Sequence, residues 1–209
     1  MEASNETRID HYNRTFFDSM AEVWDEHMGP EHAERLARIF EDLRFEPGQR
    51  VLDVGAGTGV AAALIAPRIE PGGMVIAFDV AFQMLIQGRI RNNGLQAIRY
   101  VHGNTLWLAF ASRTFDSVIC NSVFPHFSDH QAAVDELARV LTPGGECVVC
   151  HTSSRDDINA FHQSLGGVMA ECGLPDEPAM RQLFSNAGLE LAELSDGPDS
   201  YRLRAVKTQ

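Results

Sequence analysis

Strand-like apolar runs alternate with helix-like amphipathic stretches along most of this chain. The strand-like runs lie at 51–54, 74–78, 98–101, 115–121 and 147–151, and turns rich in Gly, Pro or Asn bound several of them. Stretches with apolar residues three or four positions apart lie between them, at about 59–68, 81–92 and 131–141. This alternation predicts an α/β fold, doubly wound, with a mostly parallel sheet covered by helices on both faces.

Both ends of the chain add helices and strands to this pattern. Residues 1–28 have a polar start that leads into an amphipathic helix, and 31–44 predict a second helix. Helices over about 155–172 and 176–187 precede strands near 189–195 and 200–207. Because no repeat or linker interrupts the chain, we expect one domain over 1–209. Its helical cap would cover 1–45, and a helical insertion on the substrate side would cover 152–188.

Charge and composition narrow the classes of partner. The chain has 209 residues, 29 Asp and Glu against 17 Lys and Arg, and a formal net charge of -12. Nucleic-acid binders usually present a basic patch, so we expect no nucleic acid, and an anionic membrane surface is disfavoured in the same way. The chain carries no apolar run of the ~20 residues that span a bilayer. We therefore expect a cytoplasmic protein, as a monomer or homodimer, acting on a small molecule.

The segment Cys147–His151 has the spacing of a c-type haem attachment site. It also reads as a buried strand, in which neighbouring side chains alternate between the two faces. Cys147 and Cys150 would then point to opposite sides of the sheet. We therefore interpret these cysteines as small buried apolar residues.

A glycine-rich loop carries the strongest functional signal. The strand 51–54 runs into Gly55, Gly57 and Gly59 and then into a helix. Glycine lets the backbone approach a ligand closely, and the N–H groups of a helix N-terminus favour negative charge. Asp79 closes the next strand, 20 residues after Gly59, where a carboxylate can accept both hydroxyls of an adenosine ribose. NAD and S-adenosylmethionine both carry such a ribose.

The spacing of the glycines distinguishes a loop that binds one of these cofactors from a loop that binds the other. A dinucleotide-binding loop has the pattern G-x-G-x-x-G, whereas this loop reads G-x-G-x-G and continues with Val60. Asp53 precedes the loop by two residues. A carboxylate there would repel a pyrophosphate but suits the amino group of a methionine moiety.

Four segments in order resemble the class I S-adenosylmethionine-dependent methyltransferases. Residues 51–59 resemble their first motif, and 75–80 with Met84 and Leu85 are similar to their second. Residues 115–121 and 141–145 look like their fourth strand and the turn before their fifth. Residues 16–25 also resemble the cap segment of several small-molecule members.

The resemblance implies a Rossmann-like seven-stranded sheet whose last strand is antiparallel, with S-adenosylmethionine as the cofactor. Asp53 would orient the cofactor's amino group, directly or through water, and Asp79 would hold the ribose. Asn104 stands where the family often has an acidic residue facing the adenine, and its carbonyl can still accept that hydrogen bond. The full set of implied cofactor-binding residues is Asp53, Gly55, Ala56, Gly57, Gly59, Asp79, Val80, Met84, Asn104, Thr105 and Asn121.

Methyl transfer mainly requires alignment of the reacting groups, and a base is needed only if the acceptor loses a proton. His126 and His151 follow the fourth and fifth strands, at the sheet edge where this fold binds ligands. We take these two as candidate catalytic residues. Each also fits a buried structural role. With His162 on the next helix, they offer a third alternative, which is binding a metal or a metal-bearing substrate.

The sequence thus predicts a methyltransferase that acts on a small-molecule acceptor that the sequence does not identify, with no metal of its own. One alternative is an NAD(P)-dependent oxidoreductase. Another is a non-catalytic S-adenosylmethionine-binding module that regulates a partner.

Overall fold

A single seven-stranded sheet organises the chain in the computed structural model, which describes residues 5–208, with side chains from residue 8 onward. The strand order is β3-β2-β1-β4-β5-β7-β6, and β7 pairs antiparallel with both β5 and β6, while the other neighbours are parallel. This confirms the predicted fold class and the antiparallel last strand. The strands are β1 (Arg50–Val54), β2 (Met74–Asp79), β3 (Ile98–His102), β4 (Phe115–Asn121), β5 (Leu141–His151), β6 (Leu189–Gly197) and β7 (Ser200–Lys207).

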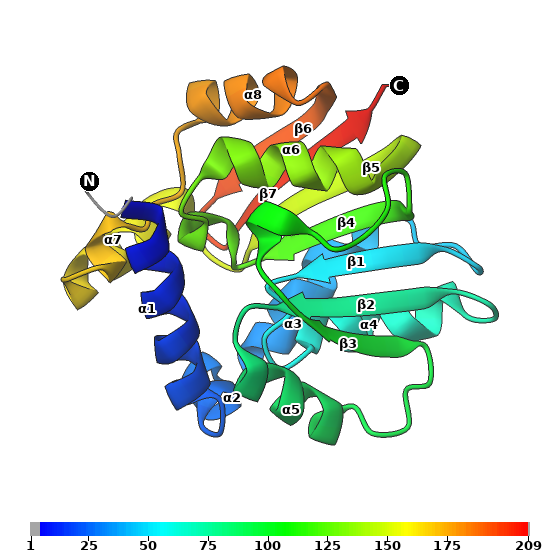
Figure 1. Cartoon of the computed structure of the whole chain (residues 1–209), viewed down its shortest axis with the longest axis horizontal. Helices are drawn as coiled ribbons and strands as arrows, with labels where there is room; N and C mark the ends of the chain where they lie inside the picture. Colours follow the sequence, from blue (N-terminus) through cyan, green and yellow to red (C-terminus); the bar gives the residue numbers. More distant parts are fainter. Residues whose placement is uncertain (1–4, 209) are drawn as a thin grey trace.

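Helices cover both faces of this sheet (Figure 1). On one face α6 and α8 contribute Leu137 and Phe184 to a core with Leu52 and Val118. On the other face α3 and α4 pack against Val51 and other strand residues. The helices are α1 (Asn5–Met20), α2 (Trp24–Met28), α3 (Glu31–Ile39), α4 (Val60–Ile69), α5 (Phe82–Arg91), α6 (His130–Val140), α7 (Arg155–Leu165) and α8 (Glu177–Asn186), with short 3-10 turns η1 (Phe40–Asp42), η2 (Thr105–Trp107), η3 (Phe124–His126) and η4 (Met169–Glu171).

Two predicted helices prove shorter than expected. The helix predicted over 155–172 ends at Leu165, because Gly166 and Gly167 adopt φ angles of 67° and 57°, which a right-handed helix does not accept. The 3-10 turn η4 follows as a separate element. The helix predicted over 31–44 ends at Ile39 and tightens into η1. Residues 1–28 contain two helices, α1 and α2, rather than one.

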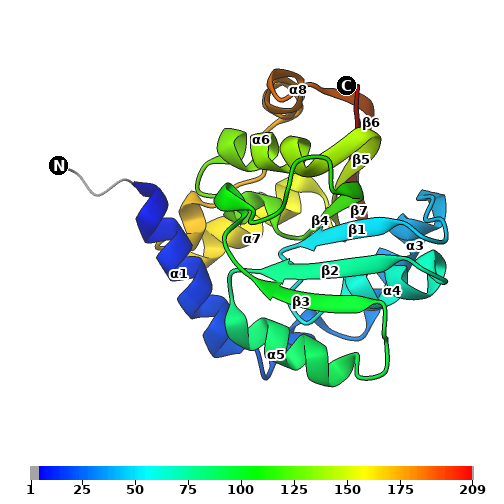
Figure 2. The same cartoon turned by 45° about the vertical axis from the view of Figure 1, so that its right-hand side comes forward.

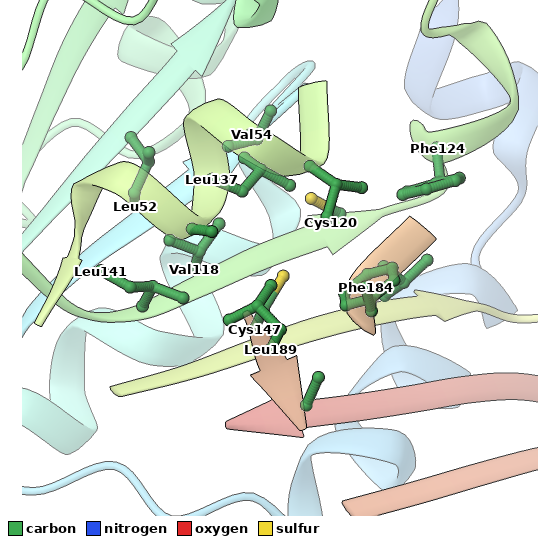
Figure 3. Close-up of a cluster of buried hydrophobic side chains, with 14 of the residues drawn as sticks. Leu52, Val54, Val118, Cys120, Phe124, Leu137, Leu141, Cys147, Phe184 and Leu189 are labelled. Carbon is green, nitrogen blue, oxygen red and sulfur yellow. The ribbon is translucent and has the colours of Figure 1, made fainter. Parts of the chain in front are cut away.

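The cysteines of β5 divide between the two sides of the sheet, as predicted. Cys147 lies in the core layer under α6 and α8, and Cys150 lies in the layer under α3 and α4. Figure 3 shows Cys147 near Cys120 and Val118 in the first of these layers. Both β5 cysteines are fully buried, which fits their interpretation as apolar core residues.

The carboxyl ends of β1, β2 and β4 meet at one edge of the sheet, and α1 runs across that edge in both views (Figures 1 and 2). This is the edge at which α/β sheets of this type bind ligands. The single domain, with its cap over 1–45 and its insertion over 152–188, stays a prediction, and residues 1–4 and 209 lie outside the described part. No helix within residues 5–208 has the length and apolar character needed to cross a bilayer.

Candidate active site

A cavity of about 210 Å³ opens at the carboxyl ends of the strands. The glycine loop after β1, the end of β2 and the turn η3 form its floor, and α1, α2 and the start of α3 form its roof. Ten of the predicted site residues line it. They are Gly55, Ala56, Gly57, Asp79, Val80, Met84, Asn104, Thr105, Asn121 and His126. Asp53, Gly59 and His151 do not line the cavity.

The glycines of the loop have different reasons to be glycine. Gly55 has φ 65°, and a Cβ there would lie 2.2 Å from Cγ2 of Val123, so packing excludes a side chain. Gly57 has φ 54°, but the nearest atom to its Cβ position is Nε1 of Trp24 at 3.9 Å. Because Gly57 lines the cavity, a side chain there would occupy the space of a ligand. Gly57 is therefore the point where the backbone lies open to a bound molecule.

Asp79 is held at the cavity wall by two backbone N–H groups. Gly57 donates to its Oδ2 at 2.8 Å, and Ala81 donates to its Oδ1 at 2.7 Å. Burial raises the pKa of this carboxyl to about 6, against these hydrogen bonds, which lower it. Each oxygen keeps further acceptor capacity, so the carboxyl can still receive hydroxyl groups from a ligand.

Asp53 lies under the loop and not at the cavity wall. Its Oδ2 accepts the N–H of Ala62, in the first turn of α4, at 3.1 Å. Its Oδ1 is buried without a partner in the protein. Burial raises the pKa of Asp53 to about 8, and the charge of Asp79 adds to this rise. The side chain therefore sits behind the loop with one oxygen free for a further hydrogen bond.

Carboxylates dominate the charges around the cavity. Asp10, Asp25 and Asp79 line it, and Arg91 is the only Arg or Lys among its described lining residues. Arg91 forms an ion pair with Asp25, whose other oxygen accepts the hydroxyl of Thr58 at 2.6 Å. The positive charge is thus already neutralised, and the cavity favours a cationic ligand over an anionic one.

Asn104 is engaged differently from the prediction. Its carbonyl oxygen accepts the N–H of Leu106 at 2.9 Å and so caps η2, while its amide donates to Asp10 at 3.2 Å. The hydrogen bond from an adenine amino group to the Asn104 carbonyl stays a prediction, and the carboxylate of Asp10, from α1, lies beside Asn104. Sequence reasoning missed Asp10 because the two residues are 94 positions apart.

The three histidines lie close together but not all at the cavity wall. The ring of His126 lines the cavity, with ring centroids 5.1 Å from Phe17 and 4.9 Å from His162. His151 is only 4% exposed and stacks edge-on to Tyr201 at 6.1 Å. Burial lowers the pKa of both His126 and His151 to about 3, so both rings are neutral at pH 7. A catalytic role for either one stays a prediction.

The arrangement gives no support to the metal-binding alternative. Among the described residues, no group of three or more His, Cys, Asp or Glu side chains is placed so that it could hold a metal ion. One nitrogen of His162 is already used, since Nδ1 lies 2.8 Å from the carbonyl of Cys172.

The N-terminal helices supply residues that sequence reasoning did not assign to the site. They share a position in the roof of the cavity, over the glycine loop and η3. Two signals pointed to this region, the aromatic spacing of the first helix and the resemblance of residues 16–25 to a cap segment, but neither indicates which side chains reach the cavity. They are Asp10, Asn13, Phe17, Trp24, Asp25 and His32.

Comparison with known proteins agrees with this geometry. A family model described as a methyltransferase domain matches residues 52–149. A demethylmenaquinone methyltransferase of Corynebacterium kroppenstedtii is 38% identical over 109 residues, which cover 52% of this chain and 44% of that protein. The enzyme of the same name from Staphylococcus aureus is 31% identical over 126 residues, covering 60% and 52%. The chain thus matches about half the length of these curated relatives.

A solved structure shares most of the fold. A chain in the complex of the Haloferax volcanii Trm112 methyltransferase activator superposes with a TM-score of 0.80. The match covers 92% of this chain and 98% of that one, at 19% sequence identity. At this identity the likeness shows the fold alone.

Proposed function

We propose that this chain is a class I S-adenosylmethionine-dependent methyltransferase, which binds S-adenosylmethionine and transfers its methyl group to an uncharged small molecule. The matched segment, residues 52–149, contains the glycine loop and both cofactor carboxylates. The cavity residues outside this segment would then determine which acceptor molecule binds.

One observation carries the choice of cofactor: two of the chain's own carboxyl groups occupy one N–H group of the loop and one of the first turn of α4. Asp79 takes the N–H of Gly57, and Asp53 takes that of Ala62 in the first turn of α4. A dinucleotide loop leaves such donors free for a pyrophosphate. With Asp10 and Asp25 also at the cavity, a pyrophosphate would meet negative charge, whereas a cofactor with an ammonium and a sulfonium group would meet favourable charge. This supports S-adenosylmethionine over NAD(P).

The residues present fit the parts of this cofactor. Gly57 offers an open backbone for the methionine portion, and the unpartnered oxygen of Asp53 behind it suits an amino group reached through water. Asp79 would accept the ribose hydroxyls. Val80 and Met84 would flank the adenine, at the side of the cavity where Asp10 and Asn104 offer polar groups.

S-adenosylmethionine supplies a methyl group that is already activated by a positively charged sulfur. The protein then has to align the acceptor and exclude water. His126 would face the acceptor as a neutral imidazole that hydrogen-bonds and orients it, and His151 would support the wall from behind. The names of the curated relatives support a quinone-type ring as the acceptor.

Calorimetric titration tests the cofactor assignment. We expect saturable binding of S-adenosylmethionine and S-adenosylhomocysteine and no heat from NADH. Asp79→Ala should weaken binding of both at least tenfold, because a buried polar contact is lost. Binding of NADH alone would favour the oxidoreductase alternative.

An acceptor screen then tests turnover, with reduced 1,4-naphthoquinone as the first candidate and mass spectrometry as the readout. A methylated product confirms methyl transfer. Tight cofactor binding without transfer to any acceptor would favour the regulatory module instead.

A further inference from the structure

Several buried polar side-chain atoms have no protein partner in this molecule. Seven side-chain N or O atoms of the described residues are buried in this way. Most buried polar groups in proteins have a partner, so exceptions that lie around one cavity call for a ligand or ordered water. Three of the seven belong to residues that line the cavity, and we call these residues the polar pouch. The atoms are Oδ1 of Asn13, Nδ1 of His126 and Oγ of Ser128, while Nε2 of His151 and the hydroxyl of Tyr201 belong to residues that do not line the cavity.

Asn13 places an acceptor in the pouch. Its Nδ2 donates to the carbonyl of His126 at 2.8 Å, which fixes the amide and leaves Oδ1 as the free group. Asn13 is 4% exposed, and it lines the same cavity as His126 and Ser128. The free oxygen therefore belongs to a residue that α1 holds against η3.

The histidines add neutral groups. Nδ1 of His162 faces the carbonyl of Cys172, which can only accept, so this nitrogen carries the proton and Nε2 carries the lone pair. The ring of His162 lies against that of His126. Burial lowers the pKa of His126, His151 and His162, so the cluster carries no positive charge at neutral pH.

One hydroxyl completes the set. Ser128 follows η3 at the cavity wall. Outside the cavity lining, Tyr201 of β7 pairs in register with His151 of β5, and its ring lies against that histidine. The pouch therefore offers both donors and acceptors, within walls that include the aromatic rings of Phe17 and Phe127.

We propose that the polar pouch is the acceptor subsite and that it selects an uncharged aromatic molecule carrying a hydroxyl group. This proposal rests on the proposed function. A hydroxyl donates and accepts at once, as the mixed groups of the pouch require. A carboxylate would be desolvated there without a cation to pair with, since Arg91 is committed to Asp25. An ether would accept from the hydroxyls but leave the acceptors of the pouch unpaired.

The test uses the full chain saturated with S-adenosylhomocysteine and three probes of similar shape: 1-naphthol, 1-methoxynaphthalene and 1-naphthoate. We expect calorimetry to show that 1-naphthol binds at least tenfold more tightly than each of the others. Equal or tighter binding of any other probe, or no binding of 1-naphthol, overturns the proposal. Failure of the cofactor assignment would appear earlier and separately, as no binding of S-adenosylhomocysteine.

Two variants connect this selectivity to the pouch. Asn13→Leu and Ser128→Ala should each reduce 1-naphthol affinity about tenfold, and by more than any change in affinity for S-adenosylhomocysteine. His130→Phe is the matched control, because His130 is a half-buried histidine that stacks on Phe124 outside the pouch. Unchanged 1-naphthol affinity in both folded pouch variants, or an equal loss in the control, overturns the assignment. Because Ser128→Ala removes only one oxygen, it keeps the test informative if Asn13→Leu fails to fold.

Discussion

At the scale of single residues, two glycines of the same loop are required for different reasons. Gly55 and Gly57 both have positive φ, yet only Gly55 is closed in by a neighbouring side chain, that of Val123. A sequence motif gives the two positions equal weight. Their surroundings in the structure distinguish a packing requirement at Gly55 from a ligand requirement at Gly57.

This difference predicts two distinct mutant phenotypes. Gly55→Ala should destabilise the fold by about 2 kcal/mol or more, since its Cβ collides with Val123 in addition to the strained φ. Gly57→Ala should destabilise it by only about 1 kcal/mol. It should nevertheless weaken binding of S-adenosylmethionine at least tenfold, because the methyl group enters the cavity.

Urea denaturation and calorimetric titration of each variant measure the two effects. If Gly57→Ala binds the cofactor as well as the parent chain does, the open backbone at this position is not where the cofactor lies.

At the scale of elements, α1 completes the site without belonging to the sheet. Asn13 is bonded to the carbonyl of His126, Asp10 receives the amide of Asn104, and Asp18 accepts the N–H of Gln83 at 2.7 Å. An isolated helix of this length is marginally stable in water, so these contacts hold it in place. The exposed ion pair between Arg8 and Glu171 adds little, because such pairs are weak in solvent.

We therefore predict that cofactor binding stabilises α1. Addition of S-adenosylhomocysteine should slow amide hydrogen exchange in residues 8–20 and 55–58, since both segments contribute to the cavity lining. The β6–β7 hairpin lies at the far edge of the sheet and serves as the internal control. Protection that extends equally over the hairpin, or no protection of α1, would contradict this role. Mass spectrometry of peptic fragments gives the required resolution.

At the scale of the whole molecule, two buried titratable groups change the stability of the fold in opposite directions as the pH changes. The pKa of His151 is lowered to about 3, so below about 6.5 the unfolded chain binds a proton that the folded chain refuses. Stability from His151 is therefore lost as pH falls from about 6.5 towards 3. Asp53 acts in the other direction, because its raised pKa favours the folded chain at low pH and loses that effect as pH rises through about 8.

A variant isolates the histidine contribution. His151→Asn cannot titrate, so the parent chain should lose about 2 kcal/mol relative to this variant between pH 7 and pH 5. Urea denaturation at the two pH values measures the difference. A stability gap that stays the same at both would mean that His151 takes up a proton over this pH range in the folded chain as it does in the unfolded chain, and would contradict its burial as a neutral ring.

Local patterns in the sequence determined the alternation of strands and helices, the glycine loop and the carboxylate at the end of β2. At the start of α7, the hydroxyl of Ser154 likewise accepts the N–H of Asp157, three positions along, at 3.1 Å. Such features depend on residues that are only a few positions apart, so a local sequence pattern is enough to predict them.

Only the tertiary structure decided what the loop and its carboxylates contact. It placed His151 behind the cavity wall and His126 on it, and it brought Asn13 to His126 across 113 positions. These relations depend on how α1 and α7 pack over the sheet edge. That packing depends on the shapes of many side chains that are far apart in the sequence, so no local sequence pattern predicts it.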